Sequence, residues 1–512
     1  MDTTQRLTIL PNEPIATVSP HLYGQFAEHL GELIYPGIWV GPDSKIPNTN
    51  GIRNDVVAAL KPLHLPVLRW PGGCFADGYH WRDGVGPRAQ RPTRINYWWG
   101  MAPEPNHFGT HEFIAFCRAI GAEPYFTGNV GSGTPKELSE WVEYCNFGGN
   151  SSLADERRGN GADQPFGVKF WAVGNESWGC GGWMDPEYYA SLFSQFRTFM
   201  FDYSDTKVHA IACGAPDCHW DWTRRFMDAL KNRFWNRQHM AQSLAAHYYC
   251  GTAGTATEYT EAQWLELLSK AAAIEGIVTG HRQIMDQCDP ERRISLIIDE
   301  WGAWHPVEAG KPSSGLYQQN TIRDACVAAL SFDVFNNHAD KIFMANMAQL
   351  INVLQSLLLV QEDRCVKTPT WHVWDLYQPH KGATAVRCIA QSETISDGGE
   401  AKDFCRRMYL GKSAFGLSTV QGSASVKEGR LCVTACNTHP TQPVELEIRL
   451  VGANLPQAEV VRLAADDIHA HNTFEQPDRV TLSVPERIEA RGGVLRAHMP
   501  PGSILRAQGD LA

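Results

Sequence analysis

The stretch Val168–Gly182, VKFWAVGNESWGCGG, decides the fold that we expect for this chain. A run of β-branched and aromatic residues ends at Asn175 and Glu176, and a glycine-rich loop follows. Such a run is typical of a strand buried in a parallel sheet, so the Glu176 carboxylate should emerge at the strand's carboxyl end. An isolated Asn-Glu pair more often starts an ordinary turn. A second stretch, Ile294–Trp304 (ISLIIDEWGAW), repeats the pattern with Glu300, so the two stretches together predict a pair of carboxylates.

From about residue 21 onward, short apolar segments alternate with segments whose apolar residues recur at helical spacing. The predicted strands are Leu22–Phe26, Val67–Trp70, Glu123–Asn129, Val168–Gly174, Val208–Cys213, Ser243–Tyr248, Ile294–Asp299 and Lys341–Ala345. Eight alternating units predict a (β/α)8 TIM barrel in preference to an open doubly wound sheet. Glu176 would then follow the fourth strand and Glu300 the seventh, on one carboxyl-terminal rim.

The pattern changes after Gln361. Residues 362–383, EDRCVKTPTWHVWDLYQPHKGA, mix turn residues with aromatics and predict a transition rather than a helix. Short alternating segments follow at 430–438, 443–452, 458–465, 479–485, 494–500 and 503–508. Regularly spaced short strands are typical of an antiparallel β-sandwich, which the N-terminal strand should join. We therefore expect a catalytic barrel over residues 21–365 and a β-sandwich domain formed by residues 1–20 and 366–512.

Composition narrows the class of function. A net charge of −11 and a pI near 5.9 provide no basic face for nucleic acid or an anionic membrane. The 17 Trp and 15 Tyr offer flat apolar rings with a polar edge, which suit sugar faces. No window approaches the ~18 apolar residues of a membrane span, and the N-terminus lacks the pattern of a secretory signal. The 14 cysteines are scattered rather than arranged as a secreted disulfide framework. We expect a cytoplasmic protein.

The motifs of several catalytic classes are absent from the sequence. We find no Ser/His/Asp signature, no GxSxG elbow and no HExxH motif, and we expect neither a metal nor a cofactor. Two carboxylates remain, the pair that glycoside hydrolysis uses. Glu176 lies beside Trp178, where desolvation by aromatic rings favours the acid form, whereas Tyr249 and Arg69 are donors that would favour an ionised Glu300.

Six segments resemble bacterial α-L-arabinofuranosidases of glycoside hydrolase family 51, in the order of that family. They are GQFAEHLGELIYPGIWVG, LRWPGGCFADGYHWRDGVGP, WAVGNESWG, AHYY, IIDEWGAWH and MAQLINVL, and they run from residue 24 to beyond residue 350. This family belongs to a clan of retaining (β/α)8 hydrolases whose acid/base and nucleophile follow strands four and seven. The resemblance implies that Glu176 is the general acid/base and Glu300 the nucleophile.

The resemblance also implies which residues hold the sugar. Asn175 would bond its 2-hydroxyl, where hydrogen bonds strengthen in the transition state. Glu28 and Gln349 would hold the remaining hydroxyls of the furanose. Arg69 and Tyr249 would orient the nucleophile, with His247 supporting the site. Trp304, together with either Trp98 or Trp99, would flank the sugar or the leaving group.

One position departs from the family pattern. Many members carry PGGN where this chain has PGGC, so Cys74 stands where an asparagine would touch the sugar. A thiol is a weak hydrogen-bond partner. Cys180 should lie on the same rim, and either the two cysteines form a disulfide, which requires Cα atoms closer than ~7 Å, or they are separate buried thiols.

The sequence therefore predicts a retaining exo-glycosidase that removes terminal α-L-arabinofuranosyl residues from arabinoxylan or arabinan oligosaccharides. The resemblance also implies a homo-oligomer, since many members of the family are hexamers. Two alternatives stay open. One is the same chemistry on another glycoside, as in a β-xylosidase, a galactofuranosidase or an endo-β-glucanase, and the other is an inactive carbohydrate-binding protein.

Overall fold

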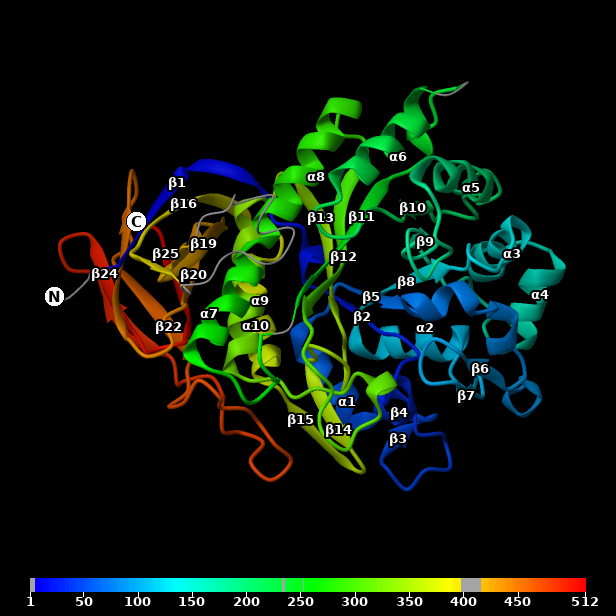
Figure 1. Ribbon diagram of the computed structural model, residues 1–512, viewed down its shortest axis with the longest axis horizontal. Helices are drawn as coiled ribbons and strands as arrows, with labels where there is room; N and C mark the ends of the chain where they lie inside the picture. The colour runs from blue at the N-terminus through cyan, green and yellow to red at the C-terminus, as the bar shows by residue number, and fades with distance from the viewer. Residues whose placement is uncertain (1–4, 233–234, 252, 397–415) are drawn as a thin grey trace.

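A closed barrel of eight parallel strands forms the larger part of the computed structural model, which describes residues 5–232, 235–251, 253–396 and 416–512 (Figure 1). The strands are β2 (Gly24–Phe26), β5 (Val67–Trp70), β8 (Glu123–Gly128), β9 (Phe170–Val173), β10 (His209–Ala212), β11 (Ser243–Cys250), β12 (Ser295–Ala303) and β13 (Ile342–Ala348). They follow one another around the ring in chain order. The predicted (β/α)8 barrel is confirmed.

Helices surround the barrel. They are α1 (Asn54–Leu60), α2 (Thr110–Ile120), α3 (Pro135–Asn146), α4 (Ser152–Gly159), α5 (Pro186–Thr198), α6 (Trp220–Asn232), α7 (Glu261–Ala272), α8 (Ile274–Cys288), α9 (Ile322–Asn337) and α10 (Pro369–Tyr377). The apolar spacing of residues 222–234 predicts a helix, which is observed as α6, although residues 233–234 lie outside the described residues. Residues 261–285 carry one continuous helical pattern in the sequence, but the structure divides this segment into α7 and α8 at Ala273.

The prediction that residues 362–383 contain no helix is wrong, because α10 lies within them. The Thr368 side chain caps this helix by accepting a hydrogen bond from the Trp371 backbone N–H, and Pro369 occupies its first turn. Trp374 is buried and donates from Nε1 to the Tyr23 carbonyl at 3.0 Å. The helix is therefore stabilised by aromatic packing against the barrel rather than by intrinsic propensity.

A second, nine-stranded sheet lies beside the barrel and contains the first and the last described strands, β1 and β25 (Figure 1). Its order is β23-β22-β25-β20-β19-β16-β1-β21-β24. The strands are β1 (Gln5–Thr17), β16 (Thr384–Gln391), β19 (Val420–Lys427), β20 (Arg430–Asn437), β21 (Val444–Leu450), β22 (Gln457–Leu463), β23 (Glu486–Glu489), β24 (Val494–Met499) and β25 (Ile504–Asp510). The sheet is antiparallel except for the β1–β21 pair. Its strands share one hydrophobic core.

The N-terminal strand joins this sheet, as predicted, between β16 and β21. The strand predicted over 479–485 is not observed, because β22 pairs instead with β23, and only an isolated bridge joins Leu482 to Leu463. Residues 1–4 of the predicted sandwich domain lie outside the described residues. The division of the chain into two domains at residues 20 and 365 stays a prediction.

The described part of the chain also contains four short strand pairs. They are β3 (Asn48–Thr49) with β4 (Ile52–Arg53), β6 (Arg94–Asn96) with β7 (Ala102–Glu104), β14 (Leu358–Gln361) with β15 (Arg364–Lys367), and β17 (Thr394–Ser396) with β18 (Gly416–Ser418). Among the described residues, no helix combines the length and apolar character needed to cross a bilayer.

The two sheets meet across α9. Asp333 of this helix accepts hydrogen bonds at Oδ1 from the hydroxyls of Ser423 and Thr434, both at 2.7 Å, and Asn336 donates to Ser423 at 3.1 Å. Burial raises the pKa of Asp333 to about 6, although the two hydroxyls oppose this shift. The contact between barrel and second sheet thus contains a titratable group.

Candidate active site

The carboxyl ends of the barrel strands surround a cavity of about 320 Å³. Nine of the twelve site residues predicted from the sequence line it, namely Glu28, Cys74, Trp99, Glu176, His247, Tyr249, Glu300, Trp304 and Gln349. Two others lie directly behind this lining, because Arg69 donates both to Glu300 and to Asn175. Trp98 does not line the cavity and is 40% exposed on the β6–β7 hairpin. Of the adjacent tryptophans, only Trp99 faces the site.

Strand β12 continues past its predicted end at Asp299. Its pairing with β11 is irregular next to two successive carboxylates, Asp299 and Glu300. The pairing of β11 with β12 shifts register between Ala246 and His247, so that His247 stands opposite Glu300. Asp299 points into the barrel, where Tyr125 and Asn346 both donate to it at 2.7 Å. Side chains that are adjacent in a regular strand point to opposite faces. Here Asp299 supports the site from inside the barrel while Glu300 faces the cavity.

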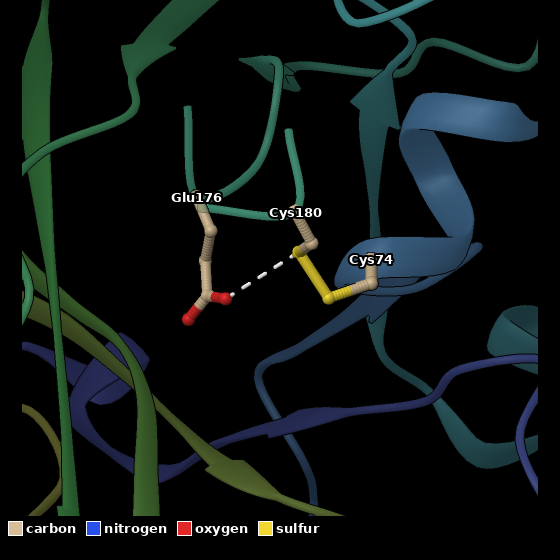
Figure 2. Close-up of side chains that lie close together, drawn as sticks. All are labelled: Cys74, Glu176 and Cys180. Atoms are coloured by element: carbon tan, nitrogen blue, oxygen red, sulfur yellow. Dashed lines mark hydrogen bonds between the residues drawn. A yellow bond between two sulfur atoms is a disulfide. The ribbon is translucent and has the colours of Figure 1, made fainter. Parts of the chain in front are cut away.

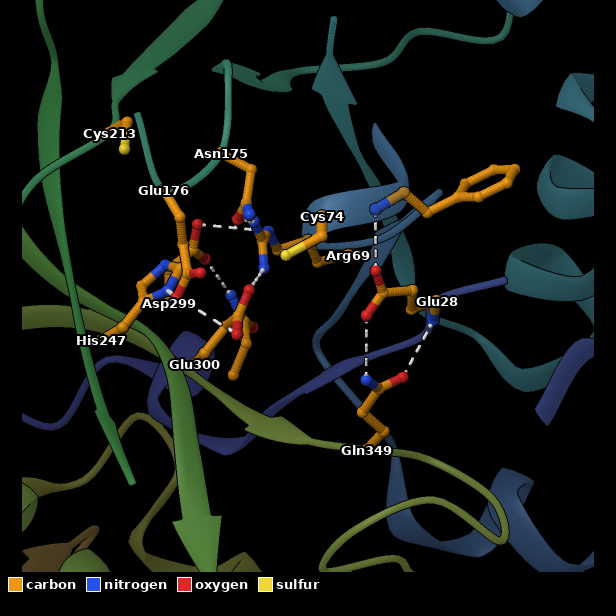
Figure 3. A network of polar contacts seen from close by, with 12 residues as sticks. Glu28, Arg69, Cys74, Asn175, Glu176, Cys213, His247, Asp299, Glu300 and Gln349 are labelled. Atoms are coloured by element: carbon orange, nitrogen blue, oxygen red, sulfur yellow. Dashed lines mark hydrogen bonds and ion pairs between the residues drawn. The ribbon is translucent and has the colours of Figure 1, made fainter. Parts of the chain in front are cut away.

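Glu300 is surrounded by donors (Figure 3). Its carboxylate accepts from Arg69 Nη1 at 2.7 Å and from the Tyr249 hydroxyl at 2.8 Å, and His247 Nδ1 lies 3.6 Å away. Burial favours a raised pKa, but the charges of His247 and Arg69 and these hydrogen bonds outweigh it, so the pKa of Glu300 lies below its ordinary value. The site therefore holds this carboxylate in its ionised form.

Glu176 follows β9 in a left-handed backbone conformation, with φ of 37°. Non-glycine residues seldom adopt such a conformation, and those that do concentrate at functional sites. His247 Nδ1 lies 2.9 Å from Glu176 Oε1. One oxygen of each carboxylate and one nitrogen of His247 all lie within 4.8 Å of one another. Burial lowers the pKa of His247, but the Glu300 and Glu176 carboxylates more than compensate, so its pKa is raised.

Cys74 and Cys180 form a disulfide, with Cα atoms 5.5 Å apart (Figure 2). Of the two alternatives that the sequence left open, the structure therefore shows the disulfide and not two separate thiols. Cys180 Sγ lies 3.5 Å from Glu176 Oε2. A disulfide sulfur carries no proton, so it can accept a hydrogen bond from a protonated carboxyl group but cannot donate one.

Glu28 lies at the other end of the cavity from Glu176 (Figure 3). Its carboxylate accepts from Trp99 Nε1 at 2.9 Å, from the Phe75 backbone N–H at 3.0 Å and from Gln349 Nε2 at 3.2 Å. Burial raises the pKa of Glu28 to about 7, and the nearby Glu300 charge contributes to the shift. This end of the cavity is thus an array of fixed polar groups.

Asp77 is a buried residue of the site that the sequence reasoning missed. It accepts backbone hydrogen bonds from Val130 and Gly131 at 2.8 Å and from Asn175 at 3.1 Å. It therefore ties together the loops that follow β8 and β9. Burial raises the pKa of Asp77 to about 7, against the effect of these donors. Its position three residues after Cys74 of the PGGC motif was the signal that could have revealed it, as the Asp-Glu pair could have revealed Asp299.

Two groups of potential metal ligands occur among the described residues, and both include Glu176. In one of them the sulfurs of Cys74 and Cys180 are joined in the disulfide and are not the thiolates that metals prefer. The other group consists of Glu176, His247 and Glu300, and the Arg69 guanidinium already pairs with Glu300. The donor set fits an acid/base pair better than a metal site.

Family models and relatives that match this chain are described as arabinofuranosidases. The family models described as alpha-L-arabinofuranosidase 1 domain and alpha-L-arabinofuranosidase C-terminal domain match residues 59–261 and 299–503. The chain is 40% identical over 505 residues to an intracellular exo-alpha-L-arabinofuranosidase of Bacteroides ovatus, covering 98% of this chain and 94% of the relative. It is 33% identical to a probable alpha-L-arabinofuranosidase C of Aspergillus flavus, covering 92% and 91%.

Solved structures agree with these relatives. The GH51 arabinofuranosidase from Xanthomonas axonopodis pv. citri superimposes with a TM-score of 0.92 at 39% identity, covering 99% of this chain and 100% of the other. An alpha-L-arabinofuranosidase from Thermotoga maritima, solved as an arabinose complex, superimposes with a TM-score of 0.86 at 30% identity and the same coverage.

Proposed function

The chain is an arabinofuranosidase that belongs to glycoside hydrolase family 51, and we propose that it removes terminal α-L-arabinofuranosyl residues from arabinoxylan or arabinan oligosaccharides with retention of configuration. The observation that carries this proposal is the separation of the two carboxylates, whose nearest oxygens lie within 4.8 Å. Retaining glycosidases place their carboxyl groups ~5 to 5.5 Å apart, whereas inverting enzymes leave ~6.5 to 9.5 Å for a water molecule.

In the first step, Glu300 attacks the anomeric carbon while Glu176 gives its proton to the departing oxygen. The charge pattern supports these roles, because Arg69 and Tyr249 stabilise the ionised Glu300. The disulfide sulfur beside Glu176 can accept from a protonated carboxyl group. The products of this step are a covalent glycosyl-enzyme and the free leaving group.

In the second step, Glu176, now ionised, takes a proton from water, which attacks the anomeric carbon and releases Glu300. His247 lies between the two carboxylates, 2.9 Å from one and 3.6 Å from the other. Its positive charge offsets the negative charge that moves between them during the cycle. This explains why a histidine, rather than a neutral amide, suits the position.

The polar groups at the Glu28 end would bind the hydroxyls of the terminal sugar. A cavity of about 320 Å³ lies at the lower end of the ~300 to 1,000 Å³ found for ligand pockets, which suits one pentose ring. Asn175, held by Arg69 and by Asp77, would contact the 2-hydroxyl. Trp304, which packs edge-on against Tyr249, would flank the sugar.

The test compares p-nitrophenyl α-L-arabinofuranoside with the corresponding β-xyloside, galactofuranoside and a β-glucan, and follows the anomer formed in methanol by NMR. We expect turnover of the arabinofuranoside and a product of the same anomeric configuration. Preference for another glycoside would show that the proposed substrate is wrong. A product of inverted anomeric configuration would refute the retaining mechanism. Binding without turnover of any of them would identify an inactive carbohydrate-binding protein.

We infer a cytoplasmic location from the name of the Bacteroides ovatus relative, which is called intracellular. Fractionation of the source cells tests this location. The expected homo-oligomer, a hexamer by analogy with the family, is tested by light scattering of the purified protein, and a mass of one 57.0 kDa chain would contradict it.

A further inference from the structure

A second cavity, of about 360 Å³, adjoins the active-site cavity. Leu30 and Trp99 line both cavities and therefore form the wall between them. The other lining residues come from three segments that are distant in the sequence, 29–35, 96–104 and 311–317. None of the residues assigned to catalysis contributes to this second cavity.

The wall stands at the end of the site that is remote from the acid/base. Trp99 Nε1 donates to Glu28, and Glu28 and Gln349 lie on the opposite side of the site from Glu176 and His247 (Figure 3). The leaving group departs on the Glu176 side. The second cavity therefore faces the hydroxyls of the terminal sugar, not its aglycone. This orientation rests on the proposed function.

The wall is fixed at both of its edges. The Trp99 indole is held by Glu28, while its backbone N–H donates to Asn96 Oδ1 at 3.2 Å. Asn96 Nδ2 in turn donates to the His29 carbonyl at 2.6 Å, which joins the β6–β7 hairpin to the segment after β2. A Cβ on the neighbouring Gly100 would lie 2.3 Å from Ser314 Oγ, so the hairpin also abuts the 311–317 segment. Trp99 thus acts as a fixed partition.

The chemistry of the second cavity suits a neutral sugar. Tyr35 and Tyr317 offer aromatic surface, and Ser314 offers a hydroxyl. The charges at its edge are already paired, because Lys311 Nζ lies 3.2 Å from Glu32 and 4.4 Å from the Tyr317 ring centroid. Its volume is similar to that of the cavity that we assign to one pentose.

We propose that Trp99 determines exo-action by sealing the glycone pocket, and that the cavity behind it is a latent subsite for a second pentofuranosyl unit. A terminal sugar that carries another pentose on one of its hydroxyls cannot enter the native pocket, since the indole occupies the path. Removal of the indole joins the two cavities. The enzyme then accepts a disaccharide as glycone and cleaves it by the same two steps at Glu300 and Glu176.

The test uses Trp99→Ala and, as matched control, Trp98→Ala, which truncates the adjacent indole outside both cavities. The substrate is the p-nitrophenyl glycoside of α-1,5-arabinobiose. The native enzyme should release arabinose before nitrophenol. Trp99→Ala should release arabinobiose with nitrophenol, raising the ratio of disaccharide to arabinose by at least about tenfold, whereas Trp98→Ala should leave it unchanged. Circular dichroism establishes that both variants are folded.

A second variant separates the subsite from a general loosening of the loop. Adding Ser314→Phe to Trp99→Ala places a ring in the second cavity and should restore the native product ratio. If Trp99→Ala is too slow to assay, calorimetry should find its affinity for arabinobiose, relative to arabinose, raised over that of the native enzyme. A native enzyme inactive on the simple arabinofuranoside would refute the proposed function. An active native enzyme whose Trp99→Ala variant gains neither product nor affinity, or whose Trp98→Ala variant gains equally, would overturn the inference about Trp99.

Discussion

Replacing Tyr249 by phenylalanine removes a single hydroxyl group from the active site and leaves its shape intact. That hydroxyl donates to Glu300 at 2.8 Å, and both side chains lie in the buried wall of the cavity. A hydrogen bond to a charged group contributes about 1.5 to 3 kcal/mol, so its loss should lower kcat/KM by roughly 10- to 150-fold. The remaining donor, Arg69, continues to hold the carboxylate in place.

The same change should move the pH dependence in a defined direction. Because the hydroxyl donates to the ionised form, it contributes to the lowered pKa of Glu300, and its removal must raise that pKa. Activity requires ionised Glu300, so the acidic limb of kcat/KM should move to higher pH, by about one pH unit for about 1.4 kcal/mol. At pH values well above this limb, part of the lost activity should return.

The assay is the pH profile of kcat/KM on p-nitrophenyl α-L-arabinofuranoside for the native enzyme, Tyr249→Phe and the matched control Tyr248→Phe. The Tyr248 hydroxyl donates to the Lys270 carbonyl at 2.6 Å, so its removal should affect stability without moving the acidic limb. Unchanged kcat/KM in Tyr249→Phe, or an acidic limb that stays in place, would refute the assignment of Glu300 as the ionised nucleophile held by this donor.

Three further predictions concern residues around the site and at the contact with the second sheet. Replacing both Cys74 and Cys180 by serine should lower the free energy of unfolding by about 2 to 4 kcal/mol in urea titrations without reductant, and equal stability would show that the disulfide does not constrain the chain. Asp77→Asn should lower kcat/KM about tenfold, because an amide cannot accept from the Asn175 N–H and from the other loop together; a change below twofold would contradict this positioning role. Asp333 has a pKa of about 6 when folded and an ordinary value of 3.8, so its contribution to stability is complete below pH ~4 and is lost as the pH rises through 6. Asp333→Asn should therefore gain stability relative to the native protein between pH 4 and pH 8, by up to about 3 kcal/mol in thermal unfolding, and a constant difference across this range would exclude the effect.

The barrel was predictable because its signals are local. Each predicted barrel strand coincides with one observed strand to within a few residues, since apolar runs and helical periodicity are properties of short segments. The two errors of the prediction lie where tertiary contacts override local pattern. Helix α10 is aromatic and flanked by prolines, and it forms because Trp374 packs into the barrel. The alternating segment at 479–485 loses its place in the sheet to Glu486–Glu489.

The two carboxylates that we propose as catalytic could be predicted from residue types and their order along the chain. Glu176 and Glu300 each follow an apolar strand, and barrel closure brings the ends of parallel strands to one rim. By contrast, the sequence offered Asp299 as an ordinary strand residue. Only the register shift between β11 and β12 makes it a support for Arg69 from inside the barrel.

What the sequence by itself determined is therefore the barrel, the pair of carboxylates and the family. What only the tertiary structure decided is which side chains meet across loops: that Cys74 reaches Cys180 over a separation of 106 residues, and that Trp99, not Trp98, lines the cavity. The physical reason is the same in both cases. Residue type and periodicity act over a few positions. The distance between two loops depends instead on how the whole barrel closes, and no short segment of sequence determines that closure.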